Sequence, residues 1–121
     1  MKRITLLVSA IALITSCKNE QAPAPVSGGL DCSKAKIDSS YVAAAIRTNC
    51  TSRGCHRGGA STIPDFSSVL KLKQFINNKP AVFALRVTGP QANMPPQRFP
   101  PLSQGMKDSL ACWVARGMPD K

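Results

Sequence analysis

Seven residues near the middle of the chain, CTSRGCH from Cys50 to His56, combine two cysteines with the only histidine of the sequence. The histidine directly follows the second cysteine, and four residues separate the two cysteines. The chain has 121 residues, which allows one domain at most. In so small a protein, whatever these thiols and this imidazole hold has a large influence on the fold.

The pattern is close to C-x-x-C-H, the signature of covalent haem attachment. Each thiol of that signature adds to a haem vinyl group, and the adjacent imidazole binds the iron from the same side of the ring. The longer spacing here requires the intervening segment to loop out, and Gly54 supplies backbone freedom beside Cys55 and His56. The segment resembles the stretched C-x4-C-H motif of some small secreted monohaem cytochromes.

Two other interpretations of the segment stay open at this point. Cys50 and Cys55 could close a small disulfide loop in an exported protein, with His56 an ordinary surface residue. A zinc site is a weaker alternative, because two thiols and one imidazole need a further ligand and the sequence has no partner cluster.

The N-terminus indicates export and lipidation. Residues 1–16 have a charged start followed by a short apolar run, and they end before Cys17 in a stretch that resembles the lipobox of bacterial lipoproteins. The resemblance implies cleavage before Cys17 and acylation of that residue, which anchors the protein to a membrane. The alternative is an ordinary signal peptide that leaves Cys17 as a stray thiol. Lys18, rather than aspartate, favours the outer membrane or the periplasmic face.

The sequence divides into three parts. Residues 1–16 are the expected lipoprotein signal peptide, and residues 17–29 are rich in proline, glycine and alanine, which is typical of a flexible tether. Residues 30–121 form the expected folded domain. No internal repeat is visible.

The charge is strongly positive, with 16 lysines and arginines against 6 acidic residues and a formal net charge of +10. Such a balance suggests a protein partner with an acidic docking surface or an anionic membrane surface. The basic residues form no block of five or more, and an exported protein rarely meets nucleic acid, so no nucleic-acid partner is expected.

Apolar periodicity predicts three or four short helices and no sheet. The first is expected over residues 37–48 with Ser39 or Ser40 as N-cap, and the second over the apolar run 66–76 with Asp65 or Ser67 as cap. Residues 81–87 suit a short helix, although Val82, Phe83 and Val87 would also suit a strand. The prolines of residues 88–101 exclude regular structure. The last helix should begin after Ser103 and end at Gly117. The predicted class is all-α, in an arrangement that needs a central group to pack around.

Because there is no second histidine, a second iron ligand from this chain is expected to be a methionine. Met106 falls on the apolar face of the last helix, which favours a role in the core, and Met118 lies at the frayed end of that helix. Met94 lies in a proline-stiffened loop, which can aim a thioether at iron. Met94 is therefore the preferred candidate.

The order of these features resembles class I cytochrome c domains over residues 37–119. A helix, the C-x4-C-H segment, an amphipathic run, a Met-Pro-Pro loop and a final helix ending in WVARGMP follow one another. The resemblance implies a cytochrome c-like fold around one covalent haem c, with Cys50 and Cys55 forming the thioethers, His56 the proximal ligand and Met94 the distal ligand. It also implies that the N- and C-terminal helices cross, in which case Cys32 and Cys112 could meet in a disulfide.

The expected function is that of a membrane-anchored monohaem c-type cytochrome, which carries single electrons between redox partners and is not an enzyme. Two alternatives remain. One is a haem-free lipoprotein interaction module stapled by disulfides, and the other is a ligand-binding or peroxidase-like haem protein with an open iron position.

Overall fold

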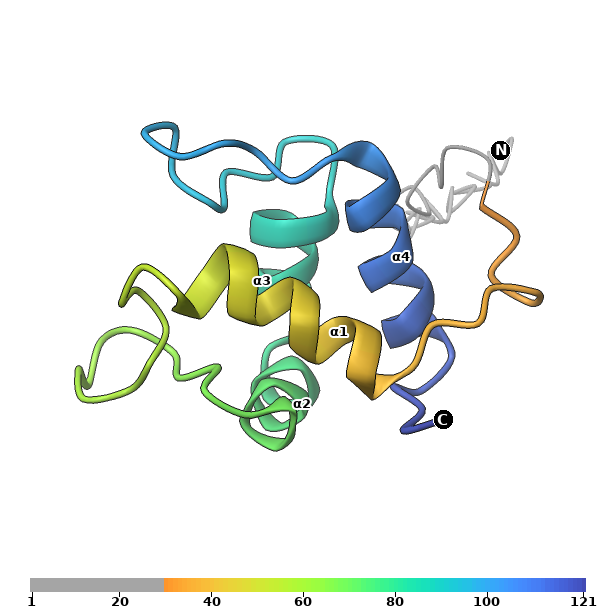
Figure 1. Cartoon of the computed structure of the whole chain (residues 1–121), viewed down its shortest axis with the longest axis horizontal. Coiled ribbons are helices and arrows are strands. Elements are labelled where there is room, and N and C mark those ends of the chain that lie inside the picture. The colour runs from red at the N-terminus through yellow and green to blue at the C-terminus, as the bar shows by residue number, and fades with distance from the viewer. Residues whose placement is uncertain (1–29) are drawn as a thin grey trace, which may run out of the picture.

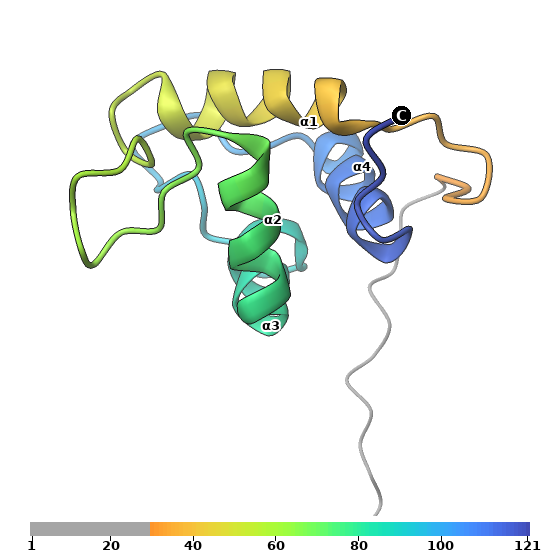
Figure 2. The same cartoon turned by 90° about the horizontal axis from the view of Figure 1, so that it is seen from below.

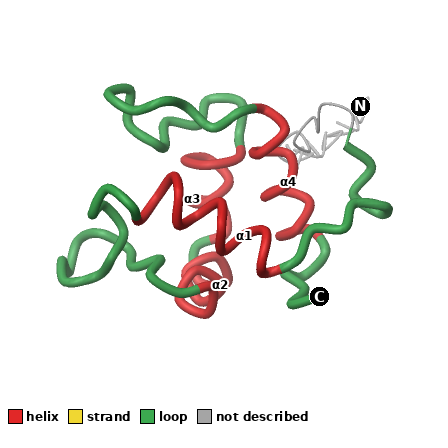
Figure 3. The backbone as a smooth tube through the Cα atoms, viewed as in Figure 1, coloured by secondary structure: helices red, strands yellow, loops and turns green. Residues whose placement is uncertain are grey.

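The computed structural model describes residues 30–121, and within that range every regular element is helical. The predicted signal peptide, Cys17 and the whole predicted tether of residues 17–29 lie outside the described residues. The described part contains no strand, so the all-α prediction is confirmed (Figures 1 and 3). None of its helices has the length and apolar character needed to cross a membrane. The elements in chain order are α1 Ser39–Ile46, η1 Arg47–Thr51, α2 Val69–Asn78, α3 Pro80–Phe83, η2 Ala84–Thr88 and α4 Gln104–Ala115.

The N-cap of helix α1 lies before both serines that the sequence suggested for it. Its N-cap is Asp38, whose carboxylate accepts a hydrogen bond from the Tyr41 amide at 2.9 Å. The prediction of Ser39 or Ser40 as cap is therefore wrong. The Ser40 hydroxyl donates to the Asp38 carboxylate at 2.7 Å, and the Ser39 hydroxyl donates to the carbonyl of Pro119 at 3.1 Å. At a helix N-terminus a carboxylate is a good hydrogen-bond acceptor for a backbone amide that has no partner within the helix, because the macrodipole there favours negative charge.

The predicted helix 37–48 is divided between two elements. The α-helical hydrogen bonding of α1 ends at Ile46, and the chain continues as a single wider turn, the π-helix η1, which contains Cys50. The helical path thus continues to Thr51, beyond the predicted end at residue 48, and includes Cys50. Short π-helical turns commonly mark functional sites because they displace side chains relative to a regular helix.

Helix α2 begins at Val69, three residues after Phe66, the first residue of the apolar run. Ser68 caps α2 by accepting from the Lys71 amide at 3.3 Å, so the prediction of Asp65 or Ser67 is wrong. The Asp65 carboxylate instead accepts from the Ser67 amide at 2.8 Å and pairs with Lys71 at 2.6 Å. These bonds hold Phe66 before the helix, where it is buried.

Residues 81–87 are helical as predicted, but in two pieces. Pro80 occupies the first turn of α3, where its missing N–H costs nothing, and η2 follows directly after Phe83. The loop after η2 has no helix until Ser103, as its prolines predicted.

Helix α4 matches the prediction at both ends. The Ser103 hydroxyl accepts from the Met106 amide at 3.2 Å. At the other end Gly117 has a φ of +79°, and the Met118 amide returns to the Trp113 carbonyl at 2.8 Å. A left-handed residue with a returning amide is the expected C-terminal cap.

Helix α4 lies against the N-terminal end of α1, and α2 runs from the other part of α1 toward α3, which lies beside α2 (Figures 1 and 2). Trp113, which is fully buried, donates from its indole N–H to the Pro119 carbonyl at 3.0 Å, the same oxygen that receives the Ser39 hydroxyl. The Arg116 guanidinium donates to the Ala35 carbonyl. The two ends of the domain are thereby joined around one core, whose largest fully buried side chains are Trp113, Leu72, Ile76, Leu110 and Val42.

Cys32 and Cys112 lie together on this side of the molecule. Their Sγ atoms are at bonding distance, and their Cα atoms are 5.1 Å apart with 80 residues between them in sequence. The Cα separation is normal for a disulfide. Cys112 itself is completely buried within the core.

Candidate cofactor-binding site

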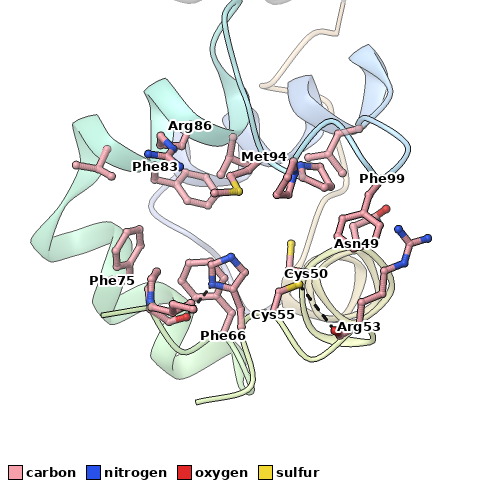
Figure 4. Close-up of a pocket in the computed structure, with 18 of the residues that line it drawn as sticks. Asn49, Cys50, Arg53, Cys55, Phe66, Phe75, Phe83, Arg86, Met94 and Phe99 are labelled. Carbon is pink, nitrogen blue, oxygen red and sulfur yellow. Dashed lines mark hydrogen bonds between the residues drawn. The ribbon is translucent and has the colours of Figure 1, made fainter. Parts of the chain in front are cut away.

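A cavity of about 670 Å³ opens between residues 50–56, here called the cysteine segment, the end of α2, η2 and the loop that follows η2. Ligand pockets of small molecules and cofactors typically measure about 300–1,000 Å³. Cys50, Cys55, His56 and Met94, the four residues predicted to hold haem, all line this cavity. Figure 4 shows Met94 reaching in from one side, with Cys50, Cys55 and Phe66 on the opposite side.

The cysteine segment is closed on itself by backbone hydrogen bonds. The His56 amide donates to the Cys50 carbonyl at 3.1 Å, and the Gly54 amide donates to the Thr51 carbonyl at 3.0 Å. Gly54 has a φ of +80°, a conformation that glycine adopts without strain. The π-helical turn η1 and this glycine together accommodate the four intervening residues, and both thiols stay at the cavity.

The imidazole of His56 is held in one orientation. Its Nδ1 lies 2.8 Å from the carbonyl oxygen of Pro64, and its ring stacks on Phe66 with centroids 4.5 Å apart and planes 16° apart. A carbonyl oxygen only accepts, so Nδ1 carries the proton in this bond and Nε2 has a free lone pair. Fixing Nδ1 to a carbonyl is the usual support of a metal-binding histidine. The Phe66 amide returns to the His56 carbonyl at 2.8 Å, which closes the loop between them.

Cys50 and Cys55 are both free thiols in this structure and both are partly buried. Burial raises the pKa of the Cys50 thiol to about 11, and the neighbouring Cys55 adds to the shift. Desolvation disfavours the thiolate, so Cys50 stays protonated at neutral pH.

We therefore expect Cys50 to react slowly with iodoacetamide in the folded, haem-free protein. At pH 8 its thiolate fraction is about 100-fold below that of a thiol of ordinary pKa, and the greater nucleophilicity of a more basic thiolate recovers about tenfold. The net rate should be about tenfold slower than for the same thiol after unfolding in urea. Mass spectrometry on a Cys55→Ser variant isolates the Cys50 thiol. Equal rates in folded and unfolded protein would contradict the buried environment.

Met94 is positioned by helix η2. The carbonyl oxygen of Arg86 accepts hydrogen bonds from the amides of both Asn93 and Met94, at 3.1 Å and 2.9 Å. These two bonds fix the first part of the loop of residues 89–103, here called the methionine loop, beside η2. The side chain of Met94 enters the cavity from there (Figure 4).

The other two methionines of residues 30–121, Met106 and Met118, do not line the cavity. The Met106 sulfur lies 3.4 Å from the Asn49 side-chain nitrogen and packs against the core, as its place on the apolar face suggested. Met118 is partly buried against the core and has a φ of 61°. Met94 is the methionine that this arrangement brings to the same cavity as His56.

The charged side chains that line the cavity, apart from His56, are all cationic. They are Arg53, Lys79, Arg86 and Arg98. In the described part of the chain the acidic residues are all aspartates, and none of them lines the cavity or forms a salt bridge with these four cations. The cavity therefore favours an anionic group.

Sequence reasoning missed these four cations and the aromatic wall of Phe66, Phe75, Phe83 and Phe99. The overall excess of basic residues was the available signal, but the four lie far apart along the chain. Phe66 and Phe75, whose rings meet edge to face at 5.2 Å, were recognised only as members of an apolar helix pattern.

Comparisons with family models, with curated proteins and with solved structures find no match to this chain. In residues 30–121, moreover, no group of three or more histidine, cysteine, aspartate or glutamate side chains could hold a metal ion. The function must therefore be argued from the cavity and from the residues around it.

Proposed function

We propose that the protein is a monohaem c-type cytochrome of the class I kind, with one haem c bound covalently in this cavity. The observation that carries the proposal is a single cavity lined by Cys50, Cys55 and His56, which Met94 enters from the side opposite the two cysteines (Figure 4). When bound, haem would supply one-electron chemistry at its iron. The protein would then carry single electrons between redox partners.

The residues present fit such a group in three respects. The cavity volume of about 670 Å³ suits a cofactor, and phenylalanine rings line much of its wall. His56 offers a fixed Nε2 lone pair from an imidazole whose Nδ1 is already satisfied by Pro64. Lys79 and Arg86 are available for the two carboxylates that haem carries, because neither cation has a salt-bridge partner in the described residues.

The chain's own residues would perform the supporting roles. Cys50 and Cys55 would fix the cofactor in one orientation by thioether bonds, and the Pro64 carbonyl would keep the His56 ring aligned. Met94 would offer its thioether sulfur to the iron, which would favour the reduced state because thioether ligation raises the reduction potential. The apolar wall would exclude water.

Two alternatives make different use of the same residues. In a haem-free interaction module the neighbouring thiols of Cys50 and Cys55 would join in a disulfide, beside the Cys32–Cys112 pair. In a ligand-binding or peroxidase-like protein the iron would need an open position with polar distal groups, whereas Met94 points into that space. The first of these alternatives is the principal competitor.

The deciding experiment is a pyridine haemochrome spectrum, with the intact mass, of protein exported by bacteria that make c-type cytochromes. We expect a c-type α-band and the added mass of one haem. A haem-free protein with a mass lower by two hydrogens at Cys50 and Cys55 would establish the disulfide module instead.

Met94→Ala should retain covalent haem but change its iron ligation. Loss of the thioether should lower the reduction potential and let carbon monoxide bind the reduced protein. Potentiometric titration and the carbon monoxide difference spectrum measure both effects. Met106→Leu is the control, because it conserves volume at a core position outside the cavity. The same change in Met106→Leu, with no change in Met94→Ala, would identify a different ligand.

The partner and location proposals rest on charge and on the N-terminal sequence. A net charge of +10, with cations around the cavity, favours a redox protein that docks through an acidic surface. Acylation of Cys17 would hold the exported domain at a membrane, at the outer membrane or the periplasmic face, through the tether of residues 17–29.

A further inference from the structure

Arg53 and Phe99 join two segments that are far apart in sequence. Arg53 lies between Cys50 and Cys55, and its guanidinium carbon lies 4.5 Å from the centroid of the Phe99 ring. Arg98 approaches the same ring, with its guanidinium carbon 5.1 Å from the centroid. Figure 4 shows Arg53 and Phe99 together at the edge of the cavity, beside the cysteine segment. Both distances are within the range of a cation–π interaction.

The part of the methionine loop after Met94, residues 95–102, makes no backbone hydrogen bond to other segments of the described chain. The amides of Asn93 and Met94 donate hydrogen bonds to the Arg86 carbonyl. In residues 95–102 the one backbone bond is from the Phe99 amide to the Pro96 carbonyl at 2.9 Å, and it lies within the loop. Leu102, at the end of this stretch, is buried in the core, and the partly buried Phe99 is held at the cavity by its contact with Arg53.

The charges make the arrangement specific. Neither Arg53 nor Arg98 has a carboxylate within salt-bridge distance in the described residues. Two guanidinium groups at one site repel each other, and the electron-rich face of the ring is the group that offsets this repulsion. The longer spacing between Cys50 and Cys55 supplies Arg53, so the stretched segment gains a contact with the methionine loop.

We propose that Arg53 is a positioning residue, which holds Phe99 and thereby keeps the Met94 loop closed over the cavity. Its effect on iron ligation rests on the proposed haem function, whereas its effect on the loop does not. The Arg53–Phe99 contact would couple the segment that attaches haem on one side to the loop that provides the distal ligand on the other.

The test compares Arg53→Gln with Arg47→Gln by amide hydrogen exchange on the haem-free and the haem-loaded protein. Arg47 is exposed, carries the same charge and lies outside this cavity. Loss of one exposed cation–π contact corresponds to an opening about 2- to 5-fold more frequent. We expect exchange of both the Phe99 and the Met94 amides to accelerate by that factor in Arg53→Gln, and to recover in Arg53→Lys.

The loaded protein gives a second readout. Added imidazole should replace Met94 at the iron about 2- to 5-fold faster in Arg53→Gln than in Arg47→Gln. An unchanged exchange rate of the Phe99 amide would refute the Arg53–Phe99 contact. Faster exchange of the Phe99 amide with an unchanged rate at the Met94 amide would refute the positioning role of Arg53. Because exchange is also measured without haem, a chain that binds no haem would refute the proposed function and still return a result on Arg53.

Discussion

His56→Ala should abolish covalent haem incorporation while leaving the helices intact. His56 is the only histidine of the chain, and its Nε2 is the free imidazole nitrogen at the cavity. Loss of a residue that merely supports a metal ligand typically lowers affinity 10- to 100-fold, so loss of the ligand itself should reduce haem content by at least about 100-fold. Intact mass and the absorbance ratio of haem to protein measure the haem content.

The same substitution also removes two structural contacts, which a control must separate. Alanine loses the bond to Pro64 and the stacking on Phe66. Phe66→Leu removes the stacking and the edge contact with Phe75 but keeps the imidazole and its bond to Pro64. Its exported protein should still carry haem, with some loss of stability at this buried position. Normal haem content in His56→Ala would show that the imidazole is not an iron ligand and would overturn the proposed function.

Local chemistry made some features of the fold predictable. Ser103 and Gly117 determine the two ends of α4 through short-range capping, and the prolines between Pro90 and Pro101 exclude helix by removing donors. The N-caps of α1 and α2 were mispredicted because several polar residues stand side by side. At α1, Ser39 binds Pro119, a residue from the other end of the chain, and this contact is invisible in a local pattern.

The wall of the cavity was less predictable than its reactive residues. The two thiols and the imidazole are adjacent in sequence, so a motif was enough to select them. Arg53 and Phe99, by contrast, meet only through the tertiary fold. The π-helical turns η1 and η2 likewise depend on what lies against them, because hydrophobic periodicity does not distinguish such a turn from an ordinary helix.

Cys32→Ser should cause a large loss of stability of the folded domain. A disulfide between Cys32 and Cys112 closes a loop with a sequence separation of 80. By the chain-entropy model, a crosslink over so long a loop stabilises the folded state by up to about 4 kcal/mol. That is a large fraction of the stability of a domain of this size. Urea unfolding followed by circular dichroism should show a lower midpoint with the slope little changed or slightly increased.

Cys32 is the better site for this substitution, because Cys112 is fully buried and a serine hydroxyl there would add its own cost. The control is reduction: a thiol reductant should lower the unfolding midpoint of the wild-type protein to that of Cys32→Ser and leave the variant unchanged. The absorption bands of haem should be the same in both proteins, since neither cysteine of this pair lines the cavity. Full stability in Cys32→Ser would exclude the crosslink. A loss of haem in that variant would instead indicate that Cys112, once unpaired, competes with Cys50 and Cys55 for a disulfide partner during export.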